Sequence, residues 1–183
     1  MPKSFKFGPW PINASEIFYT SKYSLGFVNY KPITDGHLLV MTRREVHRFQ
    51  DLTSDEVSDL FQSVQAIGKV LEREYRGEAL SIALQDGPVA GQTVPHVHVH
   101  VIARRKGDYG NNDEIYKEMD KNEKDIAQIL QKSTAAGAAA GGSSSDKKSG
   151  VDNEERKPRS ADEMAAEAAK LREYFEQHED IWS

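Results

Sequence analysis

The stretch Pro95–Ile102 constrains this chain most, because histidine and valine alternate strictly along it. A period of two places successive side chains on opposite faces of a β-strand, so the alternation predicts a strand with one imidazole face and one apolar face. We expect the apolar face to enter the core and the imidazole face to meet a ligand. The two faces consist of His96, His98 and His100, and of Val97, Val99 and Val101.

The composition is that of an ordinary globular protein. The chain has 183 residues, 29% of them charged, a net charge of -5 and no cysteine. Disulfides, thiolate catalysis and cysteine-based zinc sites are therefore excluded. The acidic balance argues against nucleic acid as a partner, and no apolar run approaches the roughly 20 residues that span a membrane. Since the first residues also lack the apolar core of a secretory signal, we expect a location in the cytoplasm, with the nucleus as a further compartment.

The remaining patterns predict an α+β fold, in which a long helix and a C-terminal helix pack on an antiparallel sheet of about five strands. The capping box Thr53–Glu56 should begin the long helix, and Gly77 should end it. The turn Thr34–Gly36 should connect two strands as a hairpin. The expected strands are residues 17–19, 24–30, 37–41 and 79–85 and the histidine stretch.

The second half of the chain is less regular. We expect a catalytic domain over residues 1–120, a weak helix over 121–132 within a helical pattern at 113–131, and a disordered Ala/Gly/Ser-rich insertion over 133–159. A second capping box, Ser160–Glu163, should begin a helix over 160–177. Its apolar stripe must dock either on this domain or on a second subunit.

Three histidines in a row favour two kinds of chemistry. Zinc ligation is the weaker alternative, because a zinc site usually needs carboxylates that orient the rings and only Asp86 lies near the triad in the sequence. Attack on phosphorus is favoured, because an imidazole with a pKa near 6.5 is largely neutral at pH 7. The middle ring, His98, is then the expected nucleophile, forming a phosphohistidine-type intermediate that water resolves. The loop Gly91–Val94 supplies donors for the phosphate oxygens.

Three other polar residues have structural alternatives. Taken alone, His37 is more often a structural residue at the start of a strand, and His47 lies in a charged surface segment. Asn29 shares a strand face with Leu25 and Phe27, which predicts either the floor of a nucleobase pocket or an ordinary core strand whose last residue faces solvent.

The segment Gln85–Val101 resembles the signature of the histidine triad family, and within it the fragile-histidine-triad branch. The resemblance covers roughly residues 5–120 and 160–176. It implies a hydrolase that splits dinucleoside polyphosphates, such as diadenosine triphosphate or tetraphosphate, into AMP and the remaining nucleotide. It also implies a homodimer with one continuous sheet. The supporting segments are Phe27–Pro32, Gly36–Val40, Arg48–Leu52 and Glu163–Ala168.

The resemblance also implies a role for each matching residue. His98 would attack the α-phosphorus, while His96, His100 and His37 would orient and polarise the site. Asn29 would bind the ribose. Phe7 and Phe27 would flank the adenine. The residues implied near the phosphate chain are Gln85, Gly91, Gln92, Thr93 and Val94.

Neither an organic cofactor nor a protein-bound metal is expected, although magnesium or manganese could arrive with the polyphosphate. Two other functions stay open. One is a nucleotide-binding signalling module whose occupied complex is the output. The other is a nucleoside phosphoramidate hydrolase of the Hint type.

Overall fold

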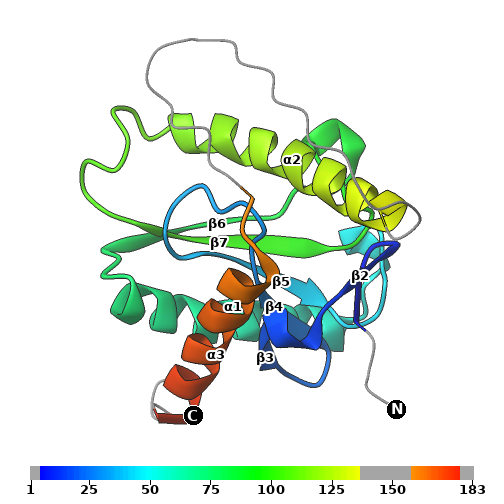
Figure 1. Cartoon of the computed structure of the whole chain (residues 1–183), viewed down its shortest axis with the longest axis horizontal. Helices are drawn as coiled ribbons and strands as arrows, with labels where there is room; N and C mark the ends of the chain where they lie inside the picture. The colour runs from blue at the N-terminus through cyan, green and yellow to red at the C-terminus, as the bar shows by residue number, and fades with distance from the viewer. Residues whose placement is uncertain (1–4, 137–157, 178–183) are drawn as a thin grey trace.

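The computed structural model describes residues 5–136 and 158–177. A five-stranded antiparallel sheet, in the order β3-β4-β5-β7-β6, follows a small β1-β2 hairpin. Figure 1 shows α2 along one face of this sheet and α1 and α3 along the other. The α+β class and the five-stranded antiparallel sheet are confirmed. The strands are β1 (Phe5–Phe7), β2 (Trp10–Ile12), β3 (Ile17–Thr20), β4 (Ser24–Val28), β5 (His37–Thr42), β6 (Ala79–Ala83) and β7 (His98–Arg104); the α-helices are α1 (Ser54–Glu74), α2 (Glu114–Ala136) and α3 (Ala161–Gln177); short 3-10 turns lie at Ala14–Glu16, Phe49–Asp51 and Pro88–Ala90.

Alternation along the central strands divides the interior into two sides. Leu38 and Val40 of β5 join the core formed with α1 and α3. Leu39 and Met41 of the same strand belong to the core on the opposite side, together with Ile126 of α2. The sheet is therefore apolar on both faces, and each face is covered by helix.

Helix α1 begins as predicted, because the Thr53 hydroxyl and the Glu56 carboxylate form the reciprocal capping box. Its end was predicted wrongly. The helix ends at Glu74, and the left-handed residue is Arg76 (φ 53°) rather than Gly77. The role of Gly77 is close packing, since a Cβ there would lie 3.3 Å from the Cβ of Ala103.

Helix α3 begins at the predicted second capping box, where the Glu163 amide donates to the Ser160 hydroxyl and the Ser160 amide to the Glu163 carboxylate. Its apolar stripe packs on this domain, in the same core as α1, which decides between the two docking alternatives. The stripe consists of Met164, Ala168, Leu171 and Phe175.

Other boundaries also differ from the expectations, including that of the strand predicted over 24–30, which ends at Val28. The strand predicted over 79–85 ends at Ala83, and the histidine strand begins at His98, two residues late. The weak helical pattern is one long helix, Glu114–Ala136, so residues 133–136 are helical and not part of an insertion. The rest of the predicted insertion, residues 137–157, lies outside the described residues. Within the described ranges, no helix combines the length and apolarity needed to cross a bilayer.

Candidate active site

Two of the three histidines lie on β7, an inner strand between β5 and β6. Val99 and Val101 enter the core beneath α1, as the alternation predicted. His98 and His100 therefore point to the opposite face, toward α2, where each side chain hydrogen-bonds Glu123. Both imidazoles are fully buried, because α2 covers them.

The hydrogen bonds of His98 determine which ring nitrogen can react. Its Nδ1 lies 2.7 Å from the His96 carbonyl oxygen. A carbonyl only accepts hydrogen bonds, so Nδ1 carries a proton. In the neutral ring the lone pair is then on Nε2, which points into the site and lies 2.7 Å from Oε1 of Glu123. This geometry assigns any nucleophilic role of His98 to Nε2.

His100 has the opposite tautomer, because a chain of donors begins at His37. The Ile33 amide donates to Nδ1 of His37 (3.2 Å). His37 therefore donates from Nε2 to Nδ1 of His100, across 2.9 Å. The proton of neutral His100 is then on Nε2, which donates to Oε1 of Glu123 at 2.9 Å. At the nitrogen that faces Glu123, Nε2, neutral His100 therefore carries a proton and can donate, whereas neutral His98 carries a lone pair.

His96 has a different position from the one that the alternation predicts. It precedes β7, and both of its nitrogens bind backbone: Nδ1 accepts from the Gly8 amide (3.1 Å) and Nε2 donates to the Thr42 carbonyl (2.7 Å). Burial lowers its pKa to about 4, so the ring is neutral. His96 joins the β1-β2 hairpin to the end of β5, which leaves neither nitrogen to polarise a substrate.

The loop before the triad contributes Thr93 directly. The Thr93 amide donates to Oε2 of Glu123 at 3.2 Å. The single proton of the Thr93 hydroxyl is shared between the Glu123 backbone carbonyl, at 2.7 Å, and Oε2, at 2.9 Å. Gly91 needs its positive φ of 98°, and a Cβ there would lie 2.3 Å from Nε2 of Gln85. Gln85 in turn donates to Asp120 of α2 (2.7 Å). Val94 is buried against the apolar core on this face.

Gln92 does not face the site in the way that the resemblance implied. Its Oε1 accepts from the Gly87 amide (2.8 Å). Its Nε2 donates to the carbonyls of His47 and His96, at 3.0 and 3.3 Å. The side chain thus holds the loop from within. His47 is exposed at the surface, as expected.

The residues expected around the nucleoside lie beside the triad and are also covered. The Phe7 ring meets the His98 ring edge-on, with their centroids 4.9 Å apart. The Phe7 ring also meets the Phe27 ring edge-on, with their centroids 5.2 Å apart. Asn29 donates to Oδ1 of Asn122 (3.1 Å) and accepts from the Lys31 amide (3.0 Å). Phe7 and Phe27 are each 1% exposed, and Asn29 is 0% exposed.

The sequence reasoning missed two site residues, Asn122 and Glu123 of α2. A weak signal was available, because Ile115, Met119 and Ile126 recur at helical intervals and the two polar residues interrupt that stripe. A charged residue on a buried helix face needs partners. Nothing in the local sequence indicates that these partners are the histidines.

Glu123 sets the charge of the site. Burial lowers the pKa of His98, but the Glu123 carboxylate outweighs burial, and the net shift is upward. For His100 burial prevails, and its pKa is lowered. Burial alone would raise the pKa of Glu123, yet the two imidazoles lower it overall. The Glu123 carboxylate thus favours the protonated form of His98, while burial favours the neutral form of His100.

A metal ion does not fit between these groups in this arrangement. Among the described residues, His98, His100 and Glu123 form the single cluster of His and acidic side chains close enough to share an ion. Zinc ligands about 2.0–2.2 Å from a tetrahedral ion would be roughly 3.3–3.6 Å from one another. The observed separations of 2.7 and 2.9 Å are hydrogen-bond lengths.

Comparisons with known proteins agree with this geometry. A bis(5'-nucleosyl)-tetraphosphatase [asymmetrical] of Schizosaccharomyces pombe is 41% identical over 98% of this chain and 99% of its own length. A bis(5'-adenosyl)-triphosphatase of Dictyostelium discoideum is 41% identical over 94% of this chain and 93% of its own. The crystal structure of the Caenorhabditis elegans NitFhit protein superposes with a TM-score of 0.66 at 33% identity, over 94% of this chain and 30% of that one. The HIT domain model matches residues 12–107, more than half of the chain. The chain therefore belongs to the HIT domain family, the histidine triad proteins.

Proposed function

We propose that this protein hydrolyses dinucleoside polyphosphates, of which diadenosine triphosphate and tetraphosphate are examples, to AMP and the remaining nucleotide. One observation supports this most strongly. Nε2 of His98 is aimed at a carboxylate that also accepts hydrogen bonds from His100 and Thr93. Such a set of donors around one nitrogen suits an α-phosphate equally well.

The reaction proceeds in two displacements. Neutral His98 attacks the α-phosphorus through Nε2, the Nε2–P bond forms, and the bond from phosphorus to the bridging oxygen breaks. The remaining nucleotide leaves with the electron pair of that bond. Water then attacks the same phosphorus and gives up one proton to solvent, the Nε2–P bond breaks with its electron pair returning to Nε2, and AMP is released. Nδ1 of His98 stays bonded to the His96 carbonyl throughout, so the ring does not turn.

The other groups act on the phosphate oxygens. The Nε2–H of His100 donates to a non-bridging oxygen, and His37 holds His100 in the tautomer that allows this donation. The Thr93 amide and hydroxyl are donors for a second oxygen. Asn29 would receive ribose hydroxyls, and Phe7 and Phe27 would flank the base. The support is that all three lie beside the triad under α2.

Magnesium or manganese would bind with the polyphosphate rather than in a cage of protein ligands. The support is that the one metal-capable cluster in the described ranges is engaged in hydrogen bonds. Chelation by EDTA should therefore raise the KM for diadenosine triphosphate. It should leave the binding of AMP alone unchanged.

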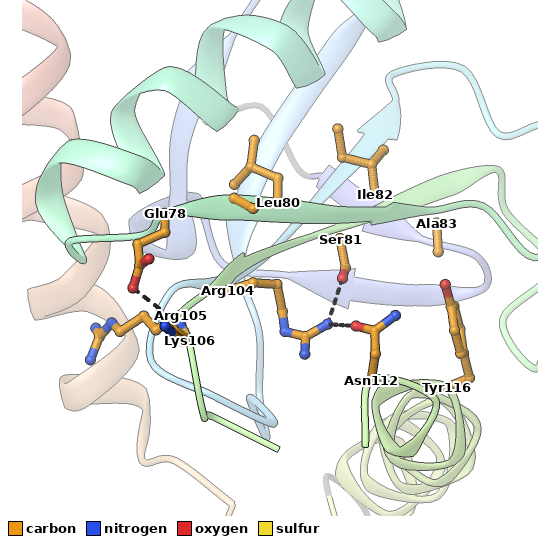
Figure 2. A pocket seen from close by; sticks show the side chains of 11 residues that line it. Glu78, Leu80, Ser81, Ile82, Ala83, Arg104, Arg105, Lys106, Asn112 and Tyr116 are labelled. Carbon is orange, nitrogen blue, oxygen red and sulfur yellow. Dashed lines mark hydrogen bonds between the residues drawn. The ribbon is translucent and has the colours of Figure 1, made fainter. Parts of the chain in front are cut away.

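A homodimer formed through β6 accounts for the exposed edge of the sheet. β6 is the last strand in the sheet order, and a pocket lies along it. Figure 2 shows Leu80 and Ile82 on one side of the strand and Ser81 and Arg104 on the other. Ile82 is 49% exposed, which is unfavourable on a free strand edge. Antiparallel pairing of two β6 strands would make one continuous sheet.

The direct test of the function is hydrolysis of diadenosine triphosphate by wild type, His98→Asn and His47→Asn, with AMP and ADP separated by chromatography. We expect His98→Asn to lose turnover by at least about a thousandfold. His47→Asn is the matched control and should keep full activity, because His47 is a surface residue. Rapid quenching of wild type should also trap AMP covalently on the protein. Equal turnover in all three proteins would refute the assignment.

A further inference from the structure

We propose that α2 is an autoinhibitory segment that occupies the nucleotide site as an internal substrate mimic and must leave before a dinucleotide binds. This inference rests on the proposed function, because it identifies the covered site with the nucleotide site. It adds a regulatory step to that function. The helix that carries this step, α2, lies outside residues 12–107, which the HIT domain model matches.

Glu123 takes the place of a phosphate. Oε1 accepts from Nε2 of both His98 and His100, at 2.7 and 2.9 Å. Oε2 accepts from the Thr93 amide at 3.2 Å and from the Thr93 hydroxyl at 2.9 Å, a proton that the hydroxyl shares with the Glu123 backbone carbonyl at 2.7 Å. Three of these donors, the His100 ring and the Thr93 amide and hydroxyl, are the ones that the proposed function directs at the non-bridging oxygens of a phosphate.

The neighbouring residues of α2 extend the mimicry along the site. Asn122 accepts from Asn29, the residue implied to bind ribose. Ile126 and Leu130 pack in the same apolar cluster as Phe7 and Phe27, the residues implied to flank adenine.

Helix α2 also contacts Gln85, one of the residues implied to lie near the phosphate chain of the substrate. Asp120 accepts from Gln85 at 2.7 Å. Of the polar residues that the resemblance implies at the substrate, five are thus bound by α2, while His37, His96 and Gln92 bind other parts of the domain. The five bound by α2 are Asn29, Gln85, Thr93, His98 and His100.

Burial makes the two occupants mutually exclusive. With α2 docked, His98 is 2% exposed and His100 0%. A nucleotide cannot reach either ring unless the helix moves. In addition, the docked carboxylate, 2.7 Å from Nε2, raises the pKa of His98 and so favours the protonated form, which has no lone pair on Nε2 to attack phosphorus. Docking therefore blocks both access and reactivity.

An ion pair between α2 and the loop after β4 provides a means of locking the helix. Nζ of Lys31 lies 2.9 Å from Oδ2 of Asp125, and both side chains are partly exposed. The chain contains no cysteine. A double variant Lys31→Cys/Asp125→Cys, bridged by a short bis-maleimide, would therefore fix α2 in place without side reactions at other thiols.

The first test compares steady-state hydrolysis of diadenosine triphosphate by Glu123→Ala and by Gln128→Ala. Gln128 is exposed on the same helix, so its variant controls for helix propensity. We expect the KM of Glu123→Ala to fall at least about tenfold, because apparent affinity rises with the fraction of site that is open. The kcat should stay within about twofold, and Gln128→Ala should match wild type. An active Glu123→Ala with an unchanged or raised KM would overturn the proposal.

The second test uses the locked helix and does not depend on Glu123→Ala folding well. Bridging the two cysteines should abolish hydrolysis, while the same protein capped with N-ethylmaleimide stays active. Full activity after bridging would refute the blocking role.

The third test separates failure of this inference from failure of the proposed function. AMP added to wild type should speed amide hydrogen exchange in residues 114–132, and inorganic sulfate at the same ionic strength should not. If no variant hydrolyses diadenosine triphosphate but AMP still releases α2, the proposed function fails and the internal mimic stands. If hydrolysis is normal and AMP leaves α2 protected, the inference fails alone.

Discussion

Replacing Ile126 with alanine should activate the enzyme, although it creates a cavity. The side chain is 1% exposed and packs from α2 into the apolar cluster that contains Phe7 and Phe27. An Ile→Ala substitution at such a position costs about 2–5 kcal/mol. Ile126 makes these contacts only while α2 is docked, so the loss falls on docking. Since about 1.4 kcal/mol is tenfold in an equilibrium constant, even the lower value shifts docking by more than tenfold.

The assay is kcat/KM for diadenosine triphosphate, measured beside the melting temperature. The matched control is Ile67→Ala, which removes the same side chain from the core between α1 and the sheet. Ile67→Ala should lower the melting temperature without raising kcat/KM. Ile126→Ala should raise kcat/KM about tenfold or more. It should lower the melting temperature less than Ile67→Ala does, because the stability lost with Ile126 cannot exceed the free energy of α2 docking. If both variants lose stability alike and neither gains activity, α2 is a structural part of the domain and not an inhibitor.

Three further outcomes are expected. The KM of wild type for diadenosine triphosphate should fall as pH rises from 6.5 to 9. The pKa of His98 is raised in the docked state, so protonated His98 stabilises docking, and this stabilisation is lost as the ring deprotonates. The charged group that faces this ring is Glu123, so Glu123→Ala, assayed across the same range, should lack this part of the profile. His37→Phe should lower kcat about tenfold to a hundredfold with little change in KM, since His100 loses the partner that fixes its tautomer. Ile82→Glu should convert a dimer to a monomer in sedimentation velocity, with Phe61→Glu, at an exposed position on α1, as the control that stays dimeric.

Local patterns predicted much of the fold, because each depended on neighbouring residues alone. The capping boxes at Thr53 and Ser160 begin helices where expected. Val99 and Val101 enter the core, as their alternation with histidine required. The errors occurred where a distant contact decides the local conformation. The left-handed residue at the end of α1 is Arg76 and not Gly77, whose amide donates to the Glu72 carbonyl and whose missing side chain allows a close approach to Ala103 on β7.

The candidate site was predictable in its residue types but not in its contacts. The alternation identified His98 and His100, and the loop contributed Thr93. His96 and Gln92 were expected at the substrate, yet both bind backbone, at Thr42 and Gly87 among other positions. A sequence pattern gives the face on which a side chain lies. It does not show which hydrogen-bonding groups of the backbone remain to be satisfied there.

Glu123 could not be found in this way, because its partners are more than twenty positions away along the chain. A site made of two imidazoles and the Thr93 amide attracts an anion whether or not substrate is present. A buried carboxylate, in turn, is tolerated only where donors surround it. When α2 docks, the donors of the site stabilise the buried Glu123 carboxylate, and the carboxylate satisfies those donors. A phosphate supplies the same negative oxygens to the same donors, and it places phosphorus, not oxygen, opposite Nε2 of His98. The arrangement that holds α2 in the absence of substrate is therefore also the one that a dinucleotide can displace.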